Sequence, residues 1–144
     1  MKVTLAIAVL LAAATLLLSA DQSTGAVHIG HDKVAAALAN GGTLLTRSDF
    51  TVSGSHRAEN GHVEMHDHET DIFYVTAGSA TFIAGGTIVG DKVTKPGQHT
   101  GTDIHGGTTY HLNQGDVMVI PAGMPHWYKE VPKSVSYFVV KVLK

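Results

Sequence analysis

The chain has 144 residues, of which 44% are hydrophobic and 15% are charged, and its formal net charge is −2 with histidine neutral. This composition excludes global disorder, and the absence of any basic run argues against nucleic acid as the main partner. The lack of cysteine excludes disulfides, a thiol nucleophile and thiolate ligands, so any metal must bind through nitrogen and oxygen. Ten histidines are the unusual feature of the composition.

Residues 1–20 (MKVTLAIAVLLAAATLLLSA) form a separate segment, with one lysine, a long apolar run and small residues at its end. This pattern predicts a secretory signal peptide cleaved after Ala20, which makes the mature protein secreted or periplasmic. The alternative is an uncleaved membrane anchor, but the apolar run is shorter than the roughly 20 residues that span a bilayer. No later apolar stretch is long enough to span one, so no membrane contact is expected after cleavage.

The rest of the chain divides into a lead-in with one short helix, residues 21–42, and a β-domain, residues 43–144. The alanine-rich stretch 31–39 favours a helix, and the glycine pair that follows it is a typical helix stop. From residue 43 onward, short β-prone runs alternate with turn residues. These runs predict strands at residues 43–46, 50–53, 62–68, 72–76, 80–83, 87–89, 108–112, 117–120 and 135–143.

Residues 91–107 are polar and glycine-rich, and they predict one long loop. Short strands separated by tight turns, in a chain long enough for one domain, predict an all-β fold. The expected architecture is a sandwich or a barrel.

Polar side chains alternate through residues 61–75 (GHVEMHDHETDIFYV), where every second position from 62 to 68 holds a histidine or a glutamate. Alternate side chains of a strand share one face, so these groups are expected to point the same way. Either that face is solvated, or the side chains converge on a metal ion. The positions concerned are His62, Glu64, His66 and His68, and Asp71 follows just before an apolar run.

A second segment, residues 115–130 (GDVMVIPAGMPHWYKE), combines an apolar strand, a Pro-x-Gly turn and a histidine just beyond it. Four of the five fixed positions in the motif G-x5-P-x-G-x2-H-x3-N are matched, by Gly115, Pro121, Gly123 and His126. In this segment the chain resembles the small cupins, and the resemblance extends over roughly residues 61–131. It implies a jelly-roll-like β-barrel, and because such proteins are often dimeric, a homodimer is expected.

The first cupin motif, G-x5-H-x-H-x3–4-E-x6-G, is matched more loosely. His66 and His68 supply the H-x-H pair, and Asp71 stands seven residues before Gly78, where the family has glutamate. Only two residues separate His68 from Asp71, fewer than the motif has. The resemblance implies one divalent metal inside the barrel. Glu64, on the face of the histidines, and Glu69, directly after them, are rival carboxylates to Asp71. The implied ligands are His66, His68, Asp71 and His126.

The resemblance and the predicted signal peptide together predict an exported cupin that binds iron, manganese, nickel, copper or zinc and acts on a small molecule. Dioxygenase, isomerase and lyase chemistries all occur in the family, so the resemblance does not choose among them. Glu64 or His62 is expected as a general base at the rim. The alternatives are a non-catalytic cupin that binds a small ligand or metal, and a structural domain without a ligand.

Overall fold

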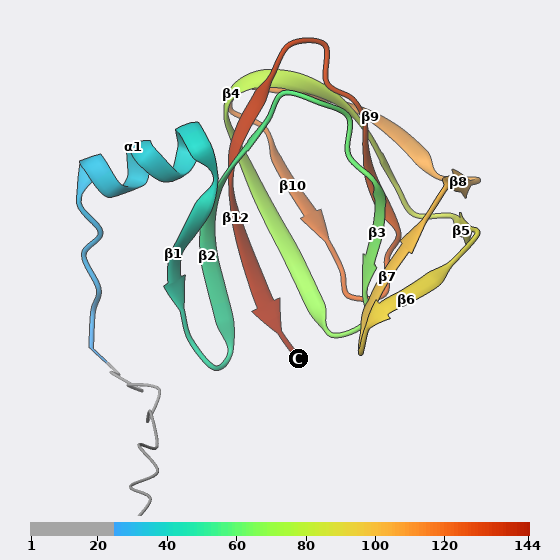
Figure 1. The fold of residues 1–144 in the computed structure, drawn as a ribbon, viewed down its shortest axis with the longest axis horizontal. Coiled ribbons are helices and arrows are strands. Elements are labelled where there is room, and N and C mark those ends of the chain that lie inside the picture. The colour runs from blue at the N-terminus through green and yellow to red at the C-terminus, as the bar shows by residue number, and fades with distance from the viewer. Residues whose placement is uncertain (1–24) are drawn as a thin grey trace, which may run out of the picture.

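The computed structural model describes residues 25–144, which form one helix beside a barrel of antiparallel strands (Figure 1). The signal peptide predicted for residues 1–20 lies outside the described residues. Within residues 25–144, no helix has both the length and the apolar character needed to cross a membrane. The predicted all-β barrel with one short N-terminal helix is confirmed.

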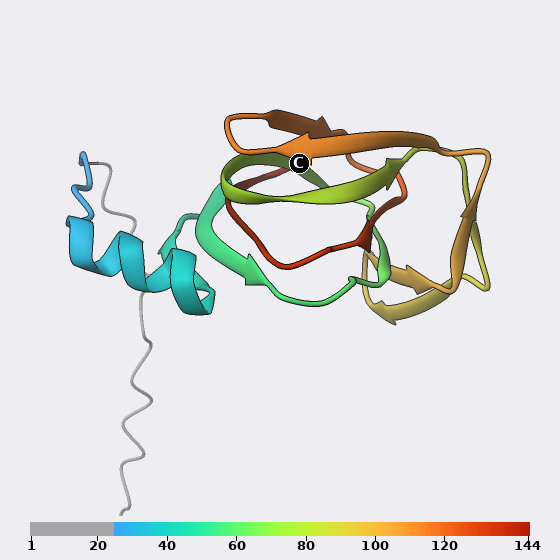
Figure 2. The same cartoon turned by 90° about the horizontal axis from the view of Figure 1, so that it is seen from above.

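Two antiparallel sheets share the long strand β4 (Glu69–Ala84). Its first half pairs with β10 and β12, and its second half pairs with β9 and β11. The first sheet also contains β1 (Gly42–Thr46), β2 (Phe50–Arg57), β10 (Val117–Ile120) and β12 (Val135–Leu143). The second also contains β3 (Val63–His66), β6 (Lys92–Lys95), β7 (Gln98–Gly101), β9 (Thr108–Asn113) and β11 (His126–Glu130). Seen from above, the strands enclose an interior (Figure 2).

Glycine allows β4 to pass from one sheet to the other at Gly78. Its φ is +76°, and a Cβ atom there would overlap the carbonyl oxygen of Ser134. Only glycine adopts this conformation readily and tolerates so close an approach. The sequence predicted two strands, 72–76 and 80–83, with a break between them. The structure has one strand instead. Gly78 bends β4 where its pairing with β12 ends, and pairing with β9 begins at the next residue.

Side chains alternate along β4 and β12, so one row from each strand faces the barrel interior. Phe73 and Val75 of β4 and Tyr137 and Val139 of β12 are buried there as part of the main core. The same inward-facing rows of side chains continue with polar residues, Asp71 of β4 and Lys141 of β12, which lie opposite each other. The core therefore ends at a buried carboxylate and an amine.

Helix α1 (His31–Asn40) packs on the outside of the first sheet, beside β1 and β2 (Figure 1). Its buried residue, Ala37, lies over Gly54 of β2, where a Cβ atom would come within 2.6 Å of the Ala37 carbonyl carbon. The helix ends where the Gly41 N–H donates to the Ala37 carbonyl at 2.9 Å. The helix predicted at residues 31–39 is therefore confirmed.

The prediction that residues 91–107 form one long loop is wrong. They contain β6, β7 and β8 (Asp103–His105), of which β7 pairs with β3, and β8 pairs with β5 (Thr87–Val89). These short strands carry mostly polar, partly exposed side chains, so they lack the apolar alternation that identifies a strand. Their pairing brings Gln98 directly opposite His66.

Candidate metal centre

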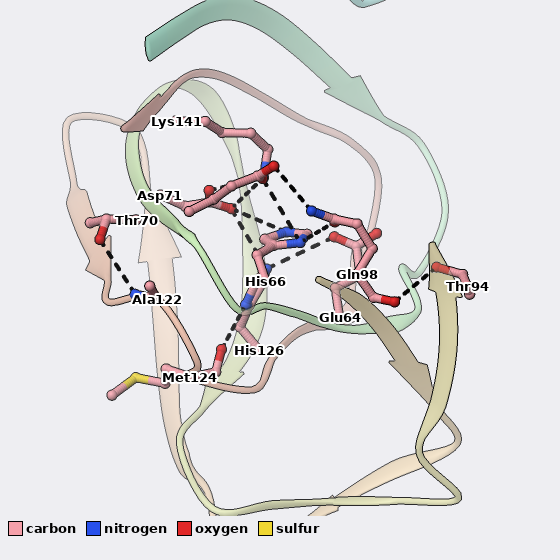
Figure 3. Close-up of polar contacts among 11 residues, drawn as sticks. Glu64, His66, Thr70, Asp71, Thr94, Gln98, Ala122, Met124, His126 and Lys141 are labelled. Atoms are coloured by element: carbon pink, nitrogen blue, oxygen red, sulfur yellow. Dashed lines mark hydrogen bonds and ion pairs between the residues drawn. The ribbon is translucent and has the colours of Figure 1, made fainter. Parts of the chain in front are cut away.

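Two histidines, His66 and His126, lie close together on neighbouring strands inside the barrel (Figure 3). Their ring centroids are 5.2 Å apart, and both residues are buried. The Pro-x-Gly turn before β11 sets this arrangement, since the Gly123 N–H donates to the His66 carbonyl oxygen at 2.7 Å. Glu64 of β3 pairs directly across from His126. The two segments singled out in the sequence therefore meet in the fold.

Hydrogen bonds determine which nitrogen of each imidazole carries a proton. His126 Nδ1 donates to the Met124 carbonyl oxygen at 3.1 Å, and a carbonyl only accepts, so Nε2 keeps its lone pair. Gln98 Nε2 donates to the Glu69 carboxylate at 3.0 Å, which turns the amide oxygen of Gln98 toward His66. His66 Nδ1 donates to that oxygen, so its Nε2 also keeps a lone pair.

Both Nε2 atoms face Asp71. The distance to Asp71 Oδ2 is 3.6 Å from His66 Nε2 and 3.8 Å from His126 Nε2. Both nitrogens are buried, and neither has a hydrogen-bond partner within residues 25–144. Burial lowers the pKa of His126 below its ordinary value, which keeps the lone pair available at neutral pH. Two buried lone pairs directed at one carboxylate define a position that suits a cation.

The spacing of these atoms fits a metal ion. Ligand atoms bonded at about 2.1 Å to a tetrahedral ion lie about 3.4 Å from one another. The separations from Asp71 are close to this value, and Glu64 Oε2 is 3.9 Å from His126 Nε2. In the part of the chain that the structure describes, two groups of three residues could hold an ion. They are Glu64, His66 and His126, and His66, Glu69 and Asp71.

Lys141 also binds the carboxylates of this group. Its Nζ donates to both oxygens of Asp71 at 2.9 and 3.0 Å and lies 3.0 Å from Glu69. Burial alone would lower the pKa of Lys141, but Asp71 and Glu69 outweigh it and hold that pKa above its ordinary value. Figure 3 shows Lys141 and Gln98 reaching the group from different strands. A hydrogen bond or ion pair thus holds each candidate ligand except Glu64 in place. Each of these ligands keeps a nitrogen or oxygen atom directed at the interior, where it could bind a metal.

A cavity of about 160 Å³ lies beside these side chains, and β2, β3, β4, β11 and β12 contribute to its wall. Glu64, Asp71 and His126 line it, together with His62 and Arg57. At about 30 Å³ per water molecule, this volume holds about five waters. The cavity therefore admits a small molecule next to the candidate metal ligands.

The sequence profile described as Cupin matches residues 39–142. The chain belongs to the cupin family. Two solved structures with a similar fold are BH2720 from Bacillus halodurans and the cupin domain of Cnp3 from Schizosaccharomyces pombe. BH2720 is 14% identical over 71% of this chain and 68% of its own length, with a TM-score of 0.53. For Cnp3 the identity is 11%, over 72% of this chain and 59% of that one, with a TM-score of 0.51. At such identities the likeness shows the fold alone, and no curated protein matches the sequence.

Of the four residues predicted as metal ligands in this cupin, the structure brings together His66, Asp71 and His126, but it places His68 apart from them. β3 was expected to run to residue 68 but ends at His66, because the Asp67 N–H turns to bond the Gly97 carbonyl at 2.9 Å. The alternation breaks at this turn, and His68 is exposed.

Glu64, one of the rival carboxylates, takes a place in the group. The first cupin motif accommodates this when Glu64 and His66 stand at its two histidine positions. Four residues then separate His66 from Asp71, within the range of the motif, and Asp71 keeps its distance from Gly78. Counting back from Gly78, instead of forward from the histidines, is the sequence signal that identifies Glu64.

Proposed function

We propose that this cupin binds one divalent metal ion through His66, His126 and the carboxylates of Glu64 and Asp71, and that it acts as a metal-dependent enzyme on a small molecule. The observation that carries the proposal is the pair of buried Nε2 atoms that face Asp71 without a hydrogen-bond partner in residues 25–144. Unsatisfied buried polar atoms are uncommon in folded proteins. One metal ion would satisfy both.

The donor set favours particular metals. Two imidazoles with two carboxylates form a harder set than the three imidazoles and one carboxylate expected from the sequence, so manganese and iron(II) fit better than copper. The hydrogen bond from His66 to Gln98 supports this role, because such outer contacts fix the ring and increase its basicity. When bound, the metal would polarise a carbonyl or hydroxyl group or activate dioxygen, as the expected isomerase, lyase and dioxygenase reactions require.

The protein's own side chains would orient the small molecule and transfer protons. His62 lines the cavity and is exposed to solvent, and it belongs to neither group of candidate ligands. With Glu64 assigned to the metal, His62 is the better of the two expected general bases. On the inner side of the cavity, the buried rings of Phe73 and Tyr128 exclude water.

Metal content measured by elemental mass spectrometry tests the site directly, with protein purified without an affinity tag. We expect close to one manganese or iron per chain in the wild type, and loss of the metal in His66→Ala and His126→Ala. His68→Ala is the matched control, because His68 is exposed outside the group, and it should keep the metal. Metal that survives in His126→Ala, or that disappears in His68→Ala, would contradict the proposed ligands.

Turnover is the second part of the test. The metal-loaded protein would be screened with small metabolites for dioxygen consumption and, by mass spectrometry, for product formation. Activity that depends on His126 and on bound metal supports an enzyme. If the protein holds metal and binds small molecules without turnover, the proposed enzymatic activity is contradicted and the proposed metal binding still stands.

Export is also part of the proposal, and it is supported by the sequence of residues 1–20 alone. N-terminal sequencing of the protein recovered outside the cytoplasm is expected to begin at or near Asp21. A membrane-bound form that keeps residues 1–20 would contradict cleavage.

A further inference from the structure

We propose that the cavity binds a small monocarboxylate, which the guanidinium of Arg57 holds beside the metal site. This inference rests on the proposed function and specifies its substrate class. Arg57 and Lys141 both line the cavity. On β2, Arg57 lies opposite Val135, and six residues away Thr51 lies opposite Lys141. The two basic residues therefore reach the same cavity from positions six residues apart along the paired strands.

The charge of Arg57 is available to a ligand. Within residues 25–144 it forms no ion pair, and its one hydrogen bond runs from Nε to the Tyr137 hydroxyl at 3.1 Å. The guanidinium also lies over the ring of Tyr128, 5.1 Å from the centroid. Lys141, by contrast, is held by Asp71 and Glu69. Among the residues that line the cavity, Arg57 is thus the basic side chain without a carboxylate partner.

The surroundings of Arg57 orient it for a carboxylate. Because Nε is bound to Tyr137, the two terminal nitrogens remain free to donate a pair of parallel hydrogen bonds, which matches the planar shape of a carboxylate. The contact with the Tyr128 ring further restricts the guanidinium. Such preorganisation reduces the entropy lost on binding.

An independent observation comes from the Tyr128 hydroxyl. Tyr128 is 4% exposed and lines the cavity, and its hydroxyl has no hydrogen-bond partner in the described part of the chain. A tyrosine hydroxyl can donate a hydrogen bond. This buried hydroxyl and the unpaired guanidinium, which lies over the ring of the same tyrosine, together suit an oxyanion.

The formal charges favour a monoanion. The carboxylates of Glu64 and Asp71 would balance a divalent metal, and Glu69 balances Lys141. The positive charge of Arg57 then remains, and one carboxylate would neutralise it. A volume of about 160 Å³ limits the ligand to a few non-hydrogen atoms. A two- or three-carbon acid satisfies both conditions.

Isothermal titration calorimetry with acetate, lactate and pyruvate, each beside its neutral amide, tests this inference on the tag-free, metal-loaded protein. We expect at least one acid to bind about tenfold or more tightly than its amide, because hydrogen bonds to charged groups are the stronger ones. Arg57→Gln should remove that preference and leave amide binding unchanged. Arg47→Gln is the matched control, since Arg47 lies in the turn between β1 and β2 and does not line the cavity, and it should preserve the preference.

A second variant covers the case in which Arg57→Gln does not fold. Tyr137→Phe keeps the buried ring but removes the hydroxyl that holds Arg57, so the affinity for the acid should fall about three- to tenfold. Circular dichroism would show that each variant is folded. Binding of no acid in preference to its amide, or an unchanged preference in the folded variants, would overturn the inference.

Metal analysis of the same samples separates the two proposals. Stoichiometric metal without any preference for the acids would overturn the carboxylate site and leave the metal site standing. A preference that depends on Arg57 in a protein that takes up no metal would support the carboxylate site and overturn the metal site.

Discussion

Replacing Lys141 with methionine tests whether Lys141 and a metal ion share Asp71. The ammonium of Lys141 contacts both oxygens of Asp71, whose side chain is 3% exposed, whereas the side chain of Lys141 is 29% exposed. Methionine keeps most of the apolar stem and removes the charge. In the metal-free protein the variant therefore leaves a buried carboxylate without its counter-charge.

The size of the effect follows from this burial. Removing one partner of a buried ion pair costs about 3–5 kcal/mol. Because Lys141 is partly solvated, we expect the lower end, about 3 kcal/mol, for the loss of folding free energy. At about 4 °C per kcal/mol for a domain of this size, Tm of the metal-free protein should fall by about 12 °C.

Bound metal should reduce this loss. An ion beside Asp71 supplies the positive charge that Lys141 no longer provides, so the metal-loaded variant should be destabilised less than the metal-free variant. By linkage, the difference appears as tighter metal binding, and a recovery of about 1.4 kcal/mol corresponds to about a tenfold lower Kd.

Thermal denaturation followed by circular dichroism, with chelator-treated and metal-loaded protein, measures both effects. Competition with a fluorescent chelator gives the metal affinity. Lys133→Met is the control, because Lys133 is exposed and forms no ion pair within residues 25–144. An equal fall in Tm with and without metal, together with an unchanged metal affinity, would refute the role of Asp71 as a shared ligand.

Three further changes test other parts of the structure. Gln98→Leu removes the partner of His66 Nδ1, so metal affinity measured by chelator competition should fall about 10–100-fold, whereas the fold should persist. Gly54→Ala places a methyl group within 2.6 Å of the α1 backbone, and calorimetry should show a loss of about 1–3 kcal/mol; an unchanged Tm would contradict this packing. Burial raises the pKa of Tyr128, so the folded protein should lose stability as pH rises above about 10, where the unfolded tyrosine ionises first. Phenolate absorbance of the folded protein should accordingly be unchanged in Tyr128→Phe, and a lower absorbance in this variant would contradict the raised pKa.

The fold could largely be predicted from the sequence, because turn residues and β-branched runs mark most strands. The errors arose where local pattern and pairing disagree. Gly78 looked like the end of a strand, yet its positive φ bends β4 from its pairing with β12 into its pairing with β9. The polar strands within residues 91–107 are held by pairing with β3 and β5, which their composition does not reveal.

The candidate site could be predicted only in part, for a related reason. His66 and His126 stand beside turn residues whose spacing is informative, and the structure places them together. Periodicity also included His68, but it cannot locate the turn at Asp67, which depends on a hydrogen bond from a distant hairpin. Lys141 carries no motif at all. Its role arises from its pairing with Asp71 across β12 and β4, a contact between residues far apart in the sequence.

The alignment of this chain with the first cupin motif connects the proposed metal site with the proposed carboxylate site. In the family pattern, three histidines and one glutamate leave a divalent metal with a net positive charge, which itself attracts an anion. Here Glu64 stands at the first histidine position and Asp71 at the glutamate position, so the proposed ligands balance the metal completely. Lys141 cannot supply the missing charge, because Asp71 and Glu69 already bind it. An anionic ligand in this barrel would therefore depend on Arg57, the basic side chain of the cavity that no carboxylate holds.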